Sequence, residues 1–260
     1  MATFSGFSSA AVDFYERLER NNTRQFWADH KTKYEHFVRD PMRDLLEELE
    51  REFGRGKVFR PNRDTRFSAN KAPYKTHQGA FVEGAMAGAP EPAAGSEPQS
   101  ASGLEASSLP GAASGPGAGA GPGAGAGPGA GANPGTGFYV EISARGLLAG
   151  GGFHAHSSGQ TARYRAAVAD DRTGPELESI VADLVEKDFD IEGERVKTAP
   201  RGYSADHPRI ELLRYKELMV FRQFGTPDWL DTPRTLEEVR ETWRAMRPLA
   251  DWVAVNAPAD

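Results

Sequence analysis

The chain has 260 residues, of which 38% are hydrophobic and 26% charged, and it carries a net charge of −6 and no cysteine. This balance is typical of a globular protein with one large domain or two small ones, and the lack of cysteine excludes disulfides, thiolate nucleophiles and zinc ribbons. No apolar run approaches the ~18 residues of a membrane-spanning helix, and the N-terminus lacks the features of a signal peptide, so we expect a cytoplasmic protein without a membrane partner.

Helical periodicity marks the first part of the chain. Ser8 or Ser9 can cap a helix that ends near Asn22, and a second helix is predicted over about 23–37. Pro41 opens a third helix, because proline is favoured in the first turn. The apolar residues of this third helix form one stripe, which consists of Met42, Leu45, Leu46, Leu49 and Phe53.

Two stretches predict neighbouring strands, HQGAFV at 77–82 and GFYVEIS at 137–143, and the second places Phe138, Val140 and Ile142 on one face. Between them, residues 84–136 are almost entirely Gly, Ala, Pro and Ser, and GPGAGA occurs three times in succession. Such a composition is typical of disorder. We therefore predict one domain formed by residues 1–83 and 137–260, with 84–136 as a disordered low-complexity insertion in a hairpin loop.

The C-terminal part alternates between helical and strand patterns. Helices are predicted over about 159–169 and 175–187, ELMVFRQF at 217–224 predicts a buried strand, and a capping box from Thr235 to Glu238 predicts the start of the last helix. Strands in the middle with helices before, between and after them indicate an α+β fold, a single domain with a largely antiparallel sheet and helices packed on it. The glycines of LLAGGGF lie in a strand-like run, so they do not form a dinucleotide-binding motif.

A basic segment stands out in this acidic chain. RPNRDTRFSANKAPYK, at 60–75, places five basic residues around a single acid, Asp64. Guanidinium groups bind carboxylate or phosphate through paired donors, and lysine adds a point charge. The candidate ligand-binding residues are Arg60, Arg63, Arg66, Lys71, Tyr74 and Lys75. Asp64 either pairs with one of the arginines in a structural loop or accepts a proton in a reaction.

Two further groups contain histidine. Asp206-His207-Pro208 predicts a helix start with Asp206 as N-cap, and it also offers His207 as a general acid or base oriented by Asp206. Asp64, Asp206 and His207 are therefore the candidate catalytic residues. His154 and His156 could share a face of a strand, but no third metal ligand lies nearby in the sequence. We predict neither a metal nor a cofactor.

The motif RxxRDxRFxxNKxxYK at 60–75 resembles that of a bacterial family known as domain of unknown function 2461. The flanking stretches NNTRQFW at 21–27, GGGF at 150–153 and APRGYSADHPRIELLRYKEL at 199–218 are also similar to this family. The resemblance covers essentially the whole chain outside the Gly/Ala/Pro-rich insertion. It implies no established activity.

Three functions from different classes remain open. The first is binding of, or action on, a phosphorylated or carboxylated small molecule. The second is a nucleotide-binding or nucleic-acid-binding module, in which Phe67 and Tyr74 stack on bases while the arginines hold phosphates. The third is a structural or interaction protein whose motif only builds an ion-paired loop. The net charge argues against a general nucleic-acid binder, and we favour an anionic small molecule as the partner.

Overall fold

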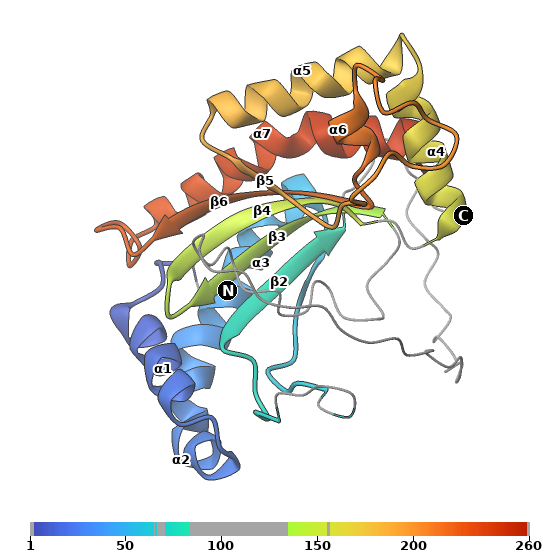
Figure 1. The fold of residues 1–260 in the computed structure, drawn as a ribbon. Helices are drawn as coiled ribbons and strands as arrows, with labels where there is room; N and C mark the ends of the chain where they lie inside the picture. The colour runs from blue at the N-terminus through green and yellow to red at the C-terminus, as the bar shows by residue number, and fades with distance from the viewer. Residues whose placement is uncertain (1–2, 65, 67–70, 84–134, 155–156, 259–260) are drawn as a thin grey trace, which may run out of the picture. The chain divides into compact units, whose positions relative to one another are not determined.

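The computed structural model describes residues 3–64, 66, 71–83, 135–154 and 157–258. These belong to the unit formed by Met1–Met86 and Asn133–Asp260. The predicted α+β fold is confirmed, because the unit contains a six-stranded sheet in the order β1-β2-β3-β4-β6-β5 with helices packed on it. All its strand pairs are antiparallel (Figure 1).

The strands alternate with helices in the following order along the chain. The elements are α1 (Ser9–Arg20), α2 (Arg24–Tyr34), the π-helix η1 (Glu35–Arg39), α3 (Asp40–Phe53), β1 (Gly56–Val58), β2 (His77–Glu83), β3 (Gly135–Ser143), β4 (Gly146–His154), α4 (Ser158–Ala169), α5 (Thr173–Glu186), β5 (Asp190–Glu192), α6 (Ile210–Leu213), β6 (Glu217–Gly225) and α7 (Arg234–Asn256).

The core lies on one face of the sheet, where α3 and α7 cover the central strands (Figure 1). Phe53 of α3, Phe138 of β3 and Trp243 of α7 meet there, with ring centroids 5.1–5.4 Å apart. The indole N–H of Trp243 also donates to the backbone oxygen of Tyr139 at 3.1 Å. The predicted inward positions Phe138, Val140 and Ile142 are all buried, which confirms the alternation read from GFYVEIS.

The opposite face of the sheet carries half-buried side chains that do not belong to the core. Successive residues of a strand point to opposite faces, so the burial of Ala80, Val140 and Val220 assigns Phe81, Tyr139 and Phe221 to the other face. We call this the ring face and define it by His77, Gly79, Phe81, Tyr139, Glu141, Gly150 and Phe221. Among the described helices, α7 contacts both β3 and β4, and α1 contacts β3.

Some boundaries differ from those expected. The predicted insertion at 84–136 lies outside the described residues except for Gly135 and Thr136, which belong to β3. The capping box at Thr235 is wrong, because α7 begins at Arg234 with Pro233 as N-cap, and the Thr235 hydroxyl donates to the Leu230 carbonyl oxygen at 2.9 Å instead. The strands β1 and β5 are only three residues long, too short to show an alternating pattern. No helix in the described part of the chain is long and apolar enough to span a bilayer.

Candidate functional site

The basic motif folds back on itself beside the start of β2. The backbone N–H of Arg63 donates to Pro73 at 2.9 Å and that of Lys75 donates to Pro61 at 2.8 Å, so Asn62 and Tyr74 form an antiparallel bridge. Phe67 and Asn70, with Thr65, Ser68 and Ala69, lie outside the described residues. Two short segments thus place the motif side chains at one end of the sheet.

Tyr74 fixes this hairpin to the N-terminal helices. The side-chain amide of Asn22 donates to the Tyr74 carbonyl at 2.9 Å and accepts from the Tyr74 N–H at 3.1 Å. The Tyr74 ring stacks on Trp27 with centroids 4.2 Å apart and an interplanar angle of 9°. Because Tyr74 is only 8% exposed, its ring anchors the motif and is not accessible for stacking on a base.

Asp64 and Arg66 form a local ion pair. Arg66 Nη2 donates to Asp64 Oδ2 at 2.7 Å and the Arg66 backbone N–H donates to Oδ1 at 3.1 Å. These hydrogen bonds lower the pKa of Asp64 to about 2, so the carboxyl group is ionised at neutral pH. The side chain of Arg66 is 77% exposed, and exposed pairs contribute little to stability. The pairing that the sequence left open as a structural alternative for Asp64 is therefore present, at the protein surface.

The remaining cations of the motif have a different environment. Within the described residues, the side chains of Arg60, Arg63 and Lys75 make no hydrogen bond and no ion pair, whereas the Lys75 ammonium lies 5.1 Å from the centroid of the Phe59 ring. Burial lowers the pKa of Lys75, the charges of Arg60 and Arg63 lower it further, and Glu141 opposes them. Arg60 and Arg63 are thus close enough to Lys75 to repel its charge. Lys71 is exposed.

His77, Tyr139 and Glu141 continue this cluster onto the ring face. The Tyr139 hydroxyl donates to Glu141 Oε2 at 2.6 Å, and His77 Nε2 lies 3.9 Å from the same oxygen. Burial is the main cause that lowers the pKa of His77, and Lys75, Arg63 and Arg145 add to it while Glu141 opposes it. Burial and Glu141 raise the pKa of Tyr139 well above its usual value. The face therefore holds a neutral histidine and a phenol beside a carboxylate, a set that can exchange protons with a bound molecule.

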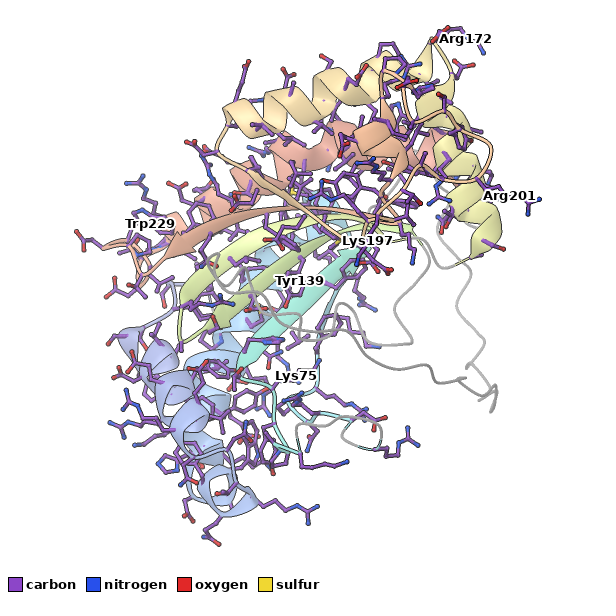
Figure 2. All side chains as sticks on the ribbon, in the orientation of Figure 1. Lys75, Tyr139, Arg172, Lys197, Arg201 and Trp229 are labelled. Carbon is purple, nitrogen blue, oxygen red and sulfur yellow. The ribbon has the colours of Figure 1, made fainter. Side chains whose placement is uncertain are left out.

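The second predicted group lies elsewhere. Helix α6 begins at Ile210 with Arg209 as its N-cap, so Asp206 does not cap it, and His207 precedes it in a turn where its Nδ1 accepts from the Arg209 N–H at 3.1 Å. Figure 1 shows α6 beside α4, and Figure 2 shows Arg201 of the same segment at the opposite end of the molecule from Lys75. The structure does not bring Asp206 and His207 to the motif.

Arg209 explains why this segment is basic. Its guanidinium is 6% exposed and donates to the carbonyl oxygens of Val168 at 2.7 Å and Ala169 at 3.0 Å, and to Asp171 at 2.8 Å. It thereby satisfies the end of α4, where free carbonyl groups favour a cation. Gly174 leaves the space for this side chain, because a Cβ there would lie 2.4 Å from Arg209 Nε.

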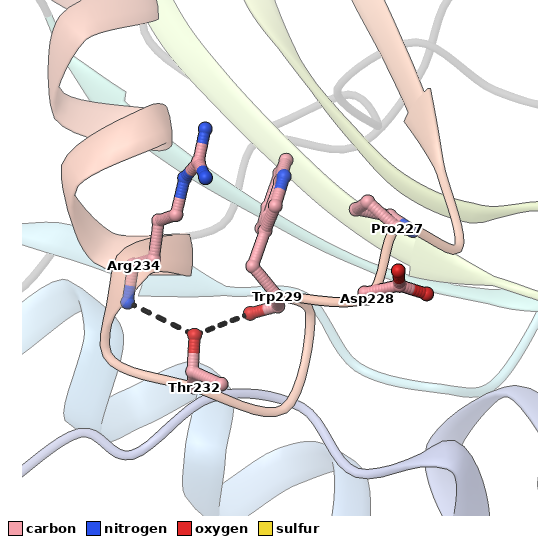
Figure 3. A pocket seen from close by; sticks show the side chains of 5 residues that line it. All are labelled: Pro227, Asp228, Trp229, Thr232 and Arg234. Carbon is pink, nitrogen blue, oxygen red and sulfur yellow. Dashed lines mark hydrogen bonds between the residues drawn. The ribbon is translucent and has the colours of Figure 1, made fainter.

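The described residues offer no group of three or more His, Cys, Asp or Glu side chains that could hold a metal ion. His156 and the side chain of His154 lie outside the described part. A shallow hollow near the start of α7 is lined by Pro227, Asp228, Trp229, Thr232 and Arg234 (Figure 3). The Arg234 guanidinium there donates to Glu238 at 2.9 Å and lies over the Trp229 ring. None of the five lining residues is a predicted site residue.

His77, Tyr139 and Glu141 were not identified as site residues from the sequence. A usable signal existed, because a strand whose Phe138, Val140 and Ile142 point to the core must place Tyr139 and Glu141 on the other face. Tyr139 and Glu141, which pair in register with Phe81 and Gly79 of β2, are a half-buried polar pair outside the core. Proximity to Lys75 was not readable, because it depends on how the motif folds back.

Comparison with known proteins identifies one matching family. The family model for a conserved hypothetical protein (DUF2461) matches residues 10–107 and 113–252. No curated protein matches the chain. The matched ranges cover most of the chain and include the whole hairpin, Asn22, Trp27, β3 and α7 as far as residue 252. The chain therefore belongs to the DUF2461 family.

Proposed function

We propose that Arg60, Arg63 and Lys75 bind the anionic group of a phosphorylated or carboxylated small molecule. The observation that carries this proposal is the lack of any acceptor for these three side chains among the described residues, although their charges depress the pKa of Lys75. Like charges held together raise the free energy of the empty protein. An anion bound between them removes that repulsion and supplies the missing acceptors.

The structural alternative accounts for part of the motif only. Asn62, Asp64, Arg66 and Tyr74 have partners that explain their positions without a ligand. A hairpin built merely for rigidity would pair its cations with acids, as Asp64 does with Arg66. The half-buried Arg63 and Lys75 have no acid paired with them among the residues that the structure describes, and this supports a ligand.

The nucleic-acid alternative has less support. Tyr74, one of the two rings proposed to stack on bases, is stacked on Trp27 instead, and Phe67 lies outside the described residues. The ring face also carries Glu141 and, on β5 opposite Phe221 and Met219, Asp190 and Glu192. These acids would repel an extended polyanion, whereas a ligand with one anionic end can avoid them.

Thermal unfolding in inorganic phosphate at low ionic strength tests the proposal. Phosphate at 100 times its Kd raises the free energy of unfolding by about 2.7 kcal/mol, so we expect a rise of several degrees in the Tm of the wild type. Arg63→Ala should lose this rise, and Arg63→Lys should lose most of it, because an ammonium cannot replace the two-pronged guanidinium. Arg201→Ala, which removes an exposed charge elsewhere, is the matched control and should keep it. A wild type without any phosphate-dependent rise, or Arg63→Ala with the full rise, contradicts the proposal.

A further inference from the structure

Three aromatic side chains line the ring face, and the rings of Tyr139 and Phe221 meet edge to face at an interplanar angle of 75°. Phe81, Tyr139, Gly150 and Phe221 occupy one row across β2, β3, β4 and β6. A Cβ at Gly79 would lie 2.4 Å from the Tyr139 hydroxyl oxygen, one at Gly137 would lie 2.0 Å from Phe81 Cζ, and one at Gly150 would lie 2.5 Å from Phe221 Cδ1. Each ring thus lies close to a glycine of a neighbouring strand, where a larger residue would collide with it.

Phe59 lies between the rings of the ring face and the cations of the motif. The Lys75 ammonium lies 5.1 Å from the centroid of Phe59, Phe59 lies 6.4 Å from Tyr139, and Tyr139 lies 6.3 Å from Phe221. Phe59, Tyr139 and Phe221 are half-buried, and none of these residues belongs to the hydrophobic core or packs against it. The Lys75 ammonium therefore lies no more than 11.5 Å from the Tyr139 centroid, and a nucleotide whose base stacks on Tyr139 can direct its phosphate toward Lys75.

From this arrangement we infer that the ring face binds a nucleotide, with its base stacked on Tyr139 and in edge contact with Phe221, and its phosphate held by Arg60, Arg63 and Lys75. Outward-facing aromatic rings on an antiparallel sheet are the way in which several protein modules hold bases, since every base has a face that can stack. Glu141, beside Tyr139, offers an acceptor to a ribose hydroxyl or a base amino group. The inference rests on the proposed anion site and adds the chemical class of the ligand.

A mononucleotide fits better than a nucleic acid strand. The cations lie at one end of the row of rings, and Asp190, which is paired in register with Phe221, lies at the other. A strand that crossed the face would bring further phosphates toward Asp190 and Glu192, whereas a single nucleotide carries charge at one end only. The net charge of −6 for the whole chain agrees with this.

Calorimetric titration of the wild type with AMP and with ribose 5-phosphate tests the inference, because these two molecules share the phosphate and differ in the base. Stacking of one base contributes about 1–3 kcal/mol, so AMP should bind at least about tenfold more tightly than ribose 5-phosphate. Equal dissociation constants overturn the inference and leave the proposed anion site standing. If neither molecule binds, and inorganic phosphate does not stabilise the protein, both are wrong.

Ring variants identify the stacking surface. Tyr139→Leu and Phe221→Leu should lose the advantage of AMP over ribose 5-phosphate, whereas Tyr139→Phe keeps the ring and should retain it. Phe224→Leu, on the opposite side of the same strand, is the matched control and should also retain it. A ten-residue oligoadenylate that binds more tightly than AMP, with an affinity that falls steeply with salt, would contradict the mononucleotide and favour a strand.

Discussion

In the segment 206–216 the charged side chains meet acceptors within the fold. Arg209 binds the end of α4, Arg214 pairs with Glu211 at 2.8 Å, and Lys216 pairs with Glu194. In the motif at 60–75, Arg66 pairs with Asp64 of its own hairpin, whereas the side chains of Arg60, Arg63 and Lys75 have no such partner among the described residues. Two segments that are both rich in cations, 206–216 and 60–75, therefore differ in what their cations contact. The cations of 206–216 hold parts of the fold together, and we propose that Arg60, Arg63 and Lys75 bind a ligand.

The largest expected effect is that of removing Arg209. Arg209→Ala leaves buried carbonyl groups of α4 without a donor, and loss of a buried charged partner costs about 3 kcal/mol or more of the free energy of unfolding. Arg63→Ala should change this free energy by no more than about 0.5 kcal/mol, or increase it, because it relieves repulsion instead of breaking a bond. Urea denaturation of both variants, with Arg201→Ala as the control, measures the difference. A loss in Arg63→Ala as large as that in Arg209→Ala would remove the contrast between the two segments.

A smaller effect is expected at Asn22, which connects the structural half of the motif to the N-terminal helices. Asn22→Ala leaves the N–H and C=O of Tyr74 without their side-chain partners, and an unsatisfied group of this kind costs about 1–3 kcal/mol. It should also weaken the response to phosphate, because the hairpin that carries Arg63 becomes less ordered. Asn21→Ala, which alters the exposed neighbour, is the matched control for urea denaturation. Wild-type stability in Asn22→Ala would mean that another contact holds the hairpin.

Local patterns predicted much of the fold, and long-range contacts account for most of what they missed. The alternation in GFYVEIS was sufficient to separate core from outer positions, and the short spacing of Asp64 and Arg66 was sufficient to propose their pairing. The stacking of Trp27 on Tyr74 joins residues far apart in the chain, so neither stretch alone indicates it. The same holds for Arg209, whose acceptors lie on α4. Whether an arginine or a histidine belongs to a site depends on its tertiary neighbours, which the local sequence around His207 and Arg209 does not indicate.

The most direct test of unpaired charge in the motif is the pKa of Lys75, followed by NMR of its side chain with and without sulfate, which stays a dianion throughout the titration. Burial and the charges of Arg60 and Arg63 should hold this pKa below the ordinary value of about 10.4 for lysine. Between the lowered pKa and the ordinary value, the unfolded chain binds the Lys75 proton more readily than the folded protein does. The free energy of unfolding of the ligand-free protein should therefore rise with pH over this range. Bound sulfate should raise the pKa of Lys75 in the wild type and not in Arg63→Ala. A pKa at the ordinary value that sulfate does not move would contradict the account.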